Sequence, residues 1–223
     1  MNPHEGLIDC RLCPRLVEWR ERKATAEKRA AFEHEDYWGR PVPALGSLTA
    51  PMLIVGLAPA AHGGNRTGRM FTGDRSGEWV FRALHRHGLA TTPDHEAEDL
   101  GLVRARITAI CHCAPPDNKP LGVEVDTCTT TWLVPEMQAM NPRVVVCLGG
   151  LAWNRVLRLG VTRLGWAIPR PRPRFGHGAE VEVPAGPLLL GSYHPSQQNT
   201  FTGRLTETMF DKTWARAVQA ING

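Results

Sequence analysis

Between an apolar run and an amphipathic one, the chain reads Met52-Leu-Ile-Val-Gly-Leu-Ala-Pro-Ala-Ala-His-Gly-Gly-Asn-Arg-Thr-Gly-Arg-Met-Phe-Thr-Gly-Asp74. The first residues, Met52 to Val55, are typical of a buried β-strand. The amphipathic run from Ser76 to His87 predicts a helix, with Ser76 as its cap and Gly88 at its end. The turn between them therefore lies at the carboxyl end of a strand, where ligands bind in open α/β sheets.

The turn combines glycines with polar side chains. Five glycines let backbone approach a ligand closely, and donors and acceptors surround Met70 and Phe71. A glycine-rich surface loop without chemistry is the alternative, but long structureless loops in compact domains are mostly functional. The turn matches neither the dinucleotide-binding nor the P-loop motif, so a nucleotide cofactor is not indicated.

Composition predicts one globular α/β domain. The chain has 223 residues, of which 42% are hydrophobic and 22% charged. The sequence contains no apolar run near the ~20 residues that span a bilayer, and its acidic start does not resemble a signal peptide. We therefore expect a cytoplasmic protein without a membrane partner. The net charge of +4 permits binding to a polyanion but does not prove it.

Six cysteines in a cytosolic chain point to metal binding or chemistry rather than to disulfides. Cys10 and Cys13 form a C-x-x-C pair directly before Pro14, and a charged helical run from about Leu16 to His34 follows. Such a pair suits redox chemistry, zinc or an iron–sulfur site. A thioredoxin-like pair would follow a strand, and none is predicted here. Half of a metal site is the better interpretation.

The other half must come from the later cysteines. Cys147 lies in the apolar run Val144–Leu148, which predicts a central strand and a buried, inert thiol. One of Cys111 and Cys113, together with Cys128, would complete four thiolates with the first pair. Four thiolates suit either tetrahedral zinc or a [4Fe-4S] cluster, and spacing alone does not choose between them.

Two further polar loops follow predicted strands. Ala114-Pro-Pro-Asp-Asn-Lys-Pro120 follows the strand Arg106–Cys113, and its prolines would hold Asn118 in a fixed place. An amide suits a base edge, although an asparagine that stabilises a turn is the alternative. The strand Leu188–Ser192 is followed by His194, which is a catalytic candidate at this edge of the sheet. The three loops can therefore converge on one pocket.

The remaining pattern alternates helices and strands. Pro135 should kink or divide the helix that contains it. The strand before residue 188 and the strand Leu188–Ser192 should form either a hairpin-like pair or a strand plus a return. The predicted elements are helices over Val123–Met140, Leu151–Leu159 and Leu205–Ile221, and a strand over Glu180–Val183.

The three loops and the cysteine pattern together resemble the family 5 (type B) uracil-DNA glycosylases, from Cys10 to the last helix. The resemblance implies a single domain, residues 1–223, folded as a three-layer α/β/α sandwich with a four-stranded parallel sheet. It also implies an N-terminal segment, about residues 1–35, fastened by a structural [4Fe-4S] cluster. By matching position, the cluster ligands are Cys10, Cys13, Cys113 and Cys128, which leaves Cys111 spare.

The resemblance also implies the activity. Such an enzyme flips uracil out of double-stranded or single-stranded DNA and cleaves the glycosidic bond without lyase chemistry, which initiates base excision repair. Some members of the family also remove hypoxanthine, xanthine or ethenocytosine. The rate depends on stabilising an oxocarbenium-like sugar and a departing uracil anion. A monomeric protein is expected.

Roles carry over by position. Phe71 would stack on the base, and Asn118 would bind its polar edge. His194 would donate to the oxygen on which charge develops, and Asp74 would position water or balance the sugar's charge. Residues expected to touch the base or catalyse are Gly56, Ala58, Phe71, Asp74, Asn118 and His194.

Two departures matter here. Other branches of the superfamily carry a polar residue in this turn, where this chain has the apolar Leu57, Ala58 and Ala60. These side chains cannot activate water, so Asp74 is expected to do so. Asp117 stands where many relatives have glycine. The loop from Ser196 to Gly203 would enter the DNA. Candidates for DNA contacts are Arg66, Arg69, Ser196, Gln197, Gln198 and Arg204.

Two rival interpretations remain open. In one, the fold is the same but another damaged base is the main substrate. In the other, the chain is a non-catalytic nucleic-acid-binding module held by zinc or a cluster. Polar side chains at three strand ends argue against a module, since a binder needs no acid beside a histidine.

Overall fold

The computed structural model describes residues 2–223 and contains a six-stranded sheet of order β1-β3-β2-β4-β6-β5. The four central strands run parallel to one another, which confirms the predicted parallel sheet. Two edge strands run antiparallel to their neighbours. The pairing of β5 with β6 matches the hairpin-like pair that the sequence predicted, whereas β1 was not predicted. The strands are β1 (Leu45–Gly46), β2 (Met52–Gly56), β3 (Ala105–Ala109), β4 (Val144–Leu148), β5 (Glu180–Glu182) and β6 (Leu188–Ser192).

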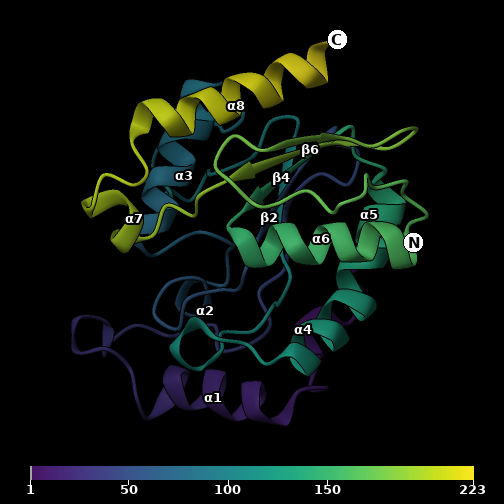
Figure 1. Cartoon of the computed structure of the whole chain (residues 1–223). Coiled ribbons are helices and arrows are strands. Elements are labelled where there is room, and N and C mark those ends of the chain that lie inside the picture. Colours follow the sequence, from purple (N-terminus) through teal and green to yellow (C-terminus); the bar gives the residue numbers. More distant parts are fainter. Residues whose placement is uncertain (1) are drawn as a thin grey trace.

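Helices cover both faces of this sheet, as Figure 1 shows. The helices α3 (Arg75–Arg86) and α8 (Glu207–Asn222) pack on one face, and α6 (Gly150–Arg163) packs with α5 (Val134–Met140) on the other. The three-layer α/β/α architecture is therefore confirmed. Within residues 2–223, none of the helices is both long and apolar enough to cross a bilayer.

The strands are buried on both faces because their sequences are continuously apolar. In β2, Ile54 joins the core under α3 and α8, while Leu53 joins the core under α6. Trp214 of α8 and Trp153 of α6 are both 0% exposed, one in each core. Burying an aromatic side chain of this size stabilises the fold by roughly 3 kcal/mol. Two well-filled cores thus hold the sheet edge where the polar loops emerge.

The helix predicted over Val123–Met140 is interrupted. It consists of α4 (Gly122–Cys128), a π-helical turn over Thr129–Leu133, and α5. Pro135 lies in the first turn of α5 and has no N–H to donate, so the chain widens into a π turn before it. The sequence predicted that Pro135 kinks or divides this helix, and the structure shows a change to a π turn directly before α5, while the backbone stays helical.

The predicted strand Arg106–Cys113 is too long, since β3 ends at Ala109. Two more backbone N–H groups, of Ile110 and Cys111, still donate to β2 and its turn at 3.0 Å. Beyond them the chain leaves the sheet and carries Cys113 toward the N-terminal segment.

The charged helix predicted from Leu16 to His34 is also too long, since α1 covers Pro14–Thr25. Its buried residues are Leu16, Val17 and Arg20, and beyond Thr25 the sequence has no comparable stripe to hold a helix against the core. In Figure 1, α1 lies away from the sheet, below α2 (Gly64–Thr67) and α4. The remaining short helices are Leu7–Asp9, Ala30–Phe32, Pro116–Asn118 and α7 (Gln197–Phe201).

Candidate active site and cysteine site

A pocket of about 510 Å³ opens where the three loops meet, as the sequence predicted. Its size lies within the range for small-molecule sites. Apolar walls come from the turn after β2, and polar groups come from all three loops. The lining includes Leu57, Ala58, Met70, Phe71, Asp74, Asn118, His194, Gln197 and Gln198.

Phe71 forms an aromatic wall of this pocket. Its backbone has a left-handed φ of 55°, which is unusual for a bulky residue and points to a specific constraint. Gly56 lies directly behind the ring, and a Cβ at that position would come within 2.7 Å of the ring's Cζ. The Phe71 ring also lies 5.8 Å from the His194 ring, at an interplanar angle of 32°. The absence of a side chain at Gly56 therefore allows the Phe71 ring to lie in this position.

Asp74 uses its two carboxylate oxygens differently. It is the N-cap of α3, and its Oδ1 accepts a hydrogen bond of 3.0 Å from the backbone N–H of Gly77. The prediction that Ser76 caps this helix is therefore wrong, because the cap is Asp74, two residues earlier. The other oxygen, Oδ2, lies 2.7 Å from where a Cβ on Gly63 would be. A helix N-terminus thus fixes the carboxylate beside the pocket.

His194 is held in the pocket by its own loop. Its backbone carbonyl accepts hydrogen bonds of 2.8 Å from the N–H of Ser196 and from the Nδ2 of Asn199. Burial lowers the pKa of His194, and the nearby charge of Asp74 opposes that shift without cancelling it. The imidazole is therefore neutral at pH 7 and can donate one N–H. Asn199 is a positioning residue that the sequence did not single out.

Asn118 lies at the open side of the pocket. It and Asp117 have left-handed φ values of 55° and 52°, within the short helix after the prolines. Glycine adopts that conformation freely, whereas Asp and Asn are among the residues that tolerate it. The position at which the resemblance suggested glycine is thus one where the backbone favours it.

Two of the predicted phosphate-contacting arginines bind protein groups. Arg66 is only 9% exposed and forms ion pairs with Glu35 and Glu96. Arg69 donates to the backbone carbonyls of Glu96 and Ala97, at 3.0 and 2.8 Å. Both side chains therefore brace the turn after β2. The sequence could not indicate this, because the acidic partners lie about thirty residues away.

The helix α7 contributes Gln197 and Gln198 to the lining of the pocket, next to Ser196. Arg204 is exposed and lies 4.6 Å from the Tyr193 ring. Ser196 caps α7, and Gln197 and Gln198 are exposed on it. Phe201, which the sequence did not single out, is 66% exposed at the end of α7.

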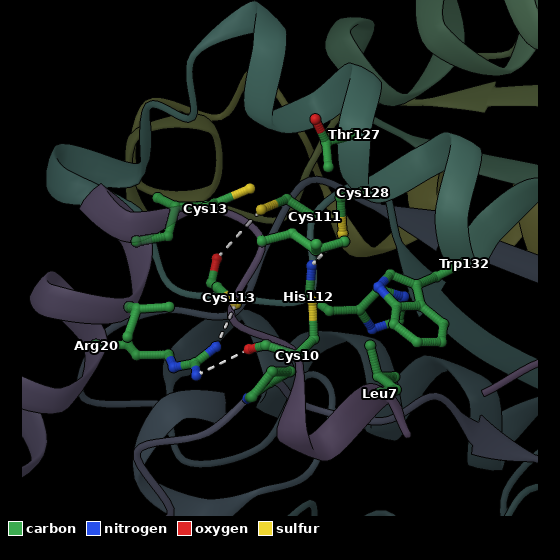
Figure 2. Close-up of a pocket in the computed structure, with 14 residues that line it drawn as sticks. Leu7, Cys10, Cys13, Arg20, Cys111, His112, Cys113, Thr127, Cys128 and Trp132 are labelled. Carbon is green, nitrogen blue, oxygen red and sulfur yellow. Dashed lines mark hydrogen bonds between the residues drawn. The ribbon is translucent and has the colours of Figure 1, made fainter. Parts of the chain in front are cut away.

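Five of the six cysteines line one cavity between the N-terminal segment, the loop after β3 and α4. Figure 2 shows these thiols turned toward a common space with Arg20 at its side. They are Cys10, Cys13, Cys111, Cys113 and Cys128. The sixth, Cys147, is 0% exposed within β4, and burial raises the pKa of its thiol, as expected for an inert core cysteine.

The groups around this cavity suit a thiolate-bound metal group. Arg20 is 2% exposed and donates from Nη1 to the Sγ of Cys113 at 2.9 Å. The backbone N–H of His112 donates to the Sγ of Cys128 at 3.3 Å. A buried guanidinium needs a negative partner, and thiolates supply one. Burial raises the pKa of Cys113 to about 12, so a metal that binds it must displace the thiol proton.

Cys111 is the fifth thiol in this cavity. It is 0% exposed, and its Sγ donates to the backbone carbonyl of Cys113 at 3.4 Å. The Cys111 sulfur points toward that of Cys13 in Figure 2. The structure thus brings together the four predicted ligands and the residue expected to be spare.

Comparison with known proteins agrees with this fold. A family model described as the uracil DNA glycosylase superfamily matches residues 43–218. The chain is 54% identical over 212 residues to the Type-5 uracil-DNA glycosylase of Mycobacterium tuberculosis, covering 93% of this chain and 76% of that protein. It is 45% identical over 208 residues to the Type-5 uracil-DNA glycosylase of Thermus thermophilus, covering 92% and 91%. A protein of the same name from Pyrobaculum aerophilum is 47% identical over 214 residues, covering 95% and 88%.

An α/β/α domain with a pocket lined by three loops at its sheet edge is the class that the fold and the site define. The chain belongs to the uracil DNA glycosylase superfamily and, within it, to the type-5 family.

Proposed function

We propose that this protein excises uracil from DNA by hydrolysing the N-glycosidic bond, leaving an abasic site that begins base excision repair. One observation carries the proposal. Phe71, Asp74, Asn118 and His194, which come from three separate loops, line a single pocket at the sheet edge. The names of the relatives, uracil-DNA glycosylases, support the choice of base.

The pocket has to receive a base that has left the helix, because the glycosidic bond cannot be reached inside a duplex. The Phe71 ring, braced by Gly56, gives the flipped base a surface on which to stack. The amide of Asn118 can donate and accept at the polar edge of uracil. Flipping costs a few kcal/mol, and less for a mispaired uracil, so mispaired sites are the better substrates.

The transition state places positive charge on the sugar and negative charge on the base. His194, neutral because burial lowers its pKa, donates its N–H to the uracil oxygen that gains charge. The carboxylate of Asp74 stabilises the sugar and orients the attacking water. Because Leu57, Ala58 and Ala60 give the turn an apolar surface, that part of the pocket cannot activate water.

The size of the pocket favours a second set of substrates. At about 510 Å³ it has room for a purine as well as for uracil. The apolar turn also offers few hydrogen-bonding groups that a base would have to match. We include hypoxanthine, xanthine and ethenocytosine as slower substrates on this ground.

DNA contacts come from the rim of the pocket. A second groove of about 430 Å³ shares Asp74 and Asn118 with the base pocket and is lined by Lys23 and Arg29. Arg29 and Arg204, which are both exposed, are our candidates for phosphate contacts in place of Arg66 and Arg69, whereas Lys23 is paired with Glu27 at 2.6 Å. In double-stranded DNA, the exposed side chains of α7 fill the gap that the flipped base leaves. They are Gln197, Gln198 and Phe201, on the helix that Ser196 caps.

The cysteine site holds a structural [4Fe-4S] cluster through Cys10, Cys13, Cys113 and Cys128. When bound, the cluster supplies a rigid tie between the N-terminal segment and the core and takes no part in glycosidic cleavage. Arg20 balances the charge of the thiolates. Free thiols and a DNA substrate suit a reducing cytoplasm. The chain acts as a monomer and as one domain, residues 1–223, to which residues 1–35 are fastened.

The test uses oligonucleotides that each carry one uracil, hypoxanthine or xanthine, single-stranded and duplex, with a thymine strand as control. We expect abasic sites at uracil, revealed as strand breaks only after alkali because the enzyme has no lyase step. Slower cleavage at the purines should follow from the roomy pocket. Binding without cleavage of any of these strands would favour the nucleic-acid-binding module instead.

A further inference from the structure

A second group of metal-ligating side chains lies beside the cysteine site, buried and outside the base pocket. It consists of His4 from the N-terminal turn, His112 from the loop after β3, and Glu136 from α5. Their ligand atoms all lie within 4.8 Å of one another. The side chains of His4 and Glu136 are 6% and 0% exposed, and His112 is 1% exposed.

His112 is oriented as a ligand. Its Nδ1 donates to the backbone carbonyl of Val42 at 2.7 Å, which fixes the ring and leaves Nε2 with its lone pair. Metal-binding histidines commonly show this arrangement, in which the second ring nitrogen bonds a carbonyl. Among residues 2–223, the Nε2 of His112 finds no hydrogen-bond partner. The rings of His112 and His4 are 5.0 Å apart and nearly perpendicular.

The carboxylate of Glu136 is also held by one hydrogen bond that leaves its second ligand atom free. Its Oε1 accepts a hydrogen bond of 2.6 Å from the Nε of Arg106, which holds the carboxylate. Its Oε2 lies 3.4 Å from the Nε2 of His4, without the geometry of a hydrogen bond in the described part of the chain. A buried carboxylate oxygen and a buried imidazole nitrogen left unpaired are each costly. A shared cation would satisfy all three side chains.

We propose that His4, His112 and Glu136 bind one divalent first-row transition metal ion, of which zinc is the best fit, at a site separate from the cysteine site. Two imidazoles and one carboxylate are a ligand set typical of zinc, with a fourth position for water. Zinc–ligand distances of about 2.0–2.1 Å require the ligand atoms to approach to roughly 3.4 Å. The Nε2 of His4 and the Oε2 of Glu136 already lie 3.4 Å apart, and all three ligand atoms lie within 4.8 Å of one another.

The surrounding charges suit such an ion. Arg106 and Glu136 offset each other, so the ion brings a net positive charge into the site. The thiols lie on the opposite side of His112, whose backbone N–H donates to the Sγ of Cys128. Four thiolates carry more negative charge than Arg20 alone offsets, and the remainder would balance the ion. The consequence is a second clip, which ties the N-terminal turn to the loop after β3 and to α5.

The competing account is an ion pair between a protonated His4 and Glu136, with no metal. The test therefore counts metal. Protein purified with its cysteine site loaded is equilibrated with zinc chloride and desalted, and zinc and iron per chain are measured by mass spectrometry. His4→Ala removes one ligand from a turn rather than from the core. His34→Ala is the matched control, because the side chain of His34 is 93% exposed.

We expect one more zinc per chain in the wild type and in His34→Ala than in His4→Ala, with equal iron in all three. The difference counts this site whether the cysteines hold iron or zinc. Zinc should raise the Tm of the wild type and His34→Ala and leave that of His4→Ala unchanged. Anomalous diffraction at the zinc edge should give a peak between His4, His112 and Glu136 in wild-type crystals. Equal zinc content in the three proteins, or no peak there, would overturn the proposal.

Discussion

Asp74 caps α3 with one carboxylate oxygen and lies beside the base pocket with the other. Structure and chemistry therefore share one side chain. Asparagine caps a helix about as well as aspartate but carries no charge. The two contributions can for this reason be separated by a single substitution.

Asp74→Asn should leave the free energy of unfolding within about 1 kcal/mol of the wild type, because the cap survives. The rate of uracil release should fall at least ~100-fold, because the charge facing the sugar is lost. Denaturant titration and single-turnover kinetics measure the two effects. Asp74→Ala is the control that should lose the cap as well, at a further cost of about 1 kcal/mol.

The lowered pKa of His194 predicts how the rate changes on the acid side of the pH profile. Burial lowers its pKa from the ordinary value of 6.5, so protonation requires a pH below that value. If the neutral imidazole is the donor, the single-turnover rate should be flat from pH 7 to 8 and fall only below pH 6.5. His194→Gln should lose most of the rate and the part of the acid limb that belongs to the histidine. A midpoint at or above pH 6.5 that disappears in His194→Gln would contradict this role.

At the scale of elements, α7 is short and has no buried residue, yet it lies at the mouth of the pocket. Its exposed Phe201 ring lies 4.5 Å from the guanidinium of Arg75. Phe201 is 66% exposed and follows Gln197 and Gln198, which line the pocket, on the same short helix. We propose that the Phe201 side chain contacts DNA.

Phe201→Ala should change stability by less than about 0.5 kcal/mol, because the side chain is exposed. The KM for duplex uracil DNA should rise about tenfold, since stacking on a base contributes roughly 1–3 kcal/mol. The effect on single strands should be smaller, because they have no gap to fill. Leu151→Ala on α6, also exposed at 61%, is the matched control and should change neither quantity. Identical KM values for Phe201→Ala and wild type on duplex DNA would count against this role.

At the scale of the whole molecule, the cysteine site connects α1 to the sheet through Cys113 and to α4 through Cys128. A [4Fe-4S] cluster makes the protein brown with absorption near ~400 nm, whereas zinc is colourless. Cys113→Ser should abolish the colour and lower the Tm by about 5 °C or more, which corresponds to a loss of roughly 2 kcal/mol.

Cys111→Ser is the matched control for that substitution, since Cys111 is equally buried in the same cavity. It should retain iron and colour. Loss of iron from Cys111→Ser, with iron retained in Cys113→Ser, would mean that Cys111 is the ligand and Cys113 is the spare thiol.

The central sheet could be predicted because β2, β4 and β6 are continuous apolar runs between turn residues. The two-residue β1 is too short to leave a pattern, and the end of β3 depends on where the neighbouring strand stops. The three loops could be predicted to meet because parallel strands place their carboxyl ends together.

The rest of the site depends on contacts between distant segments. The sequence marks Arg66 as a cation near a ligand-binding loop. Only the fold shows that Arg66 forms ion pairs with Glu35 and Glu96. In the same way, His4 and Glu136 meet across more than half of the chain. No local pattern could indicate either pairing.

The most direct test of the account is the single-turnover rate of uracil release from a duplex oligonucleotide, measured for the wild type and for Asp74→Asn with equal iron content and equal stability. The account predicts release by the wild type and a rate at least ~100-fold lower in the variant. Equal rates in the two proteins, or no release by the wild type, would contradict it.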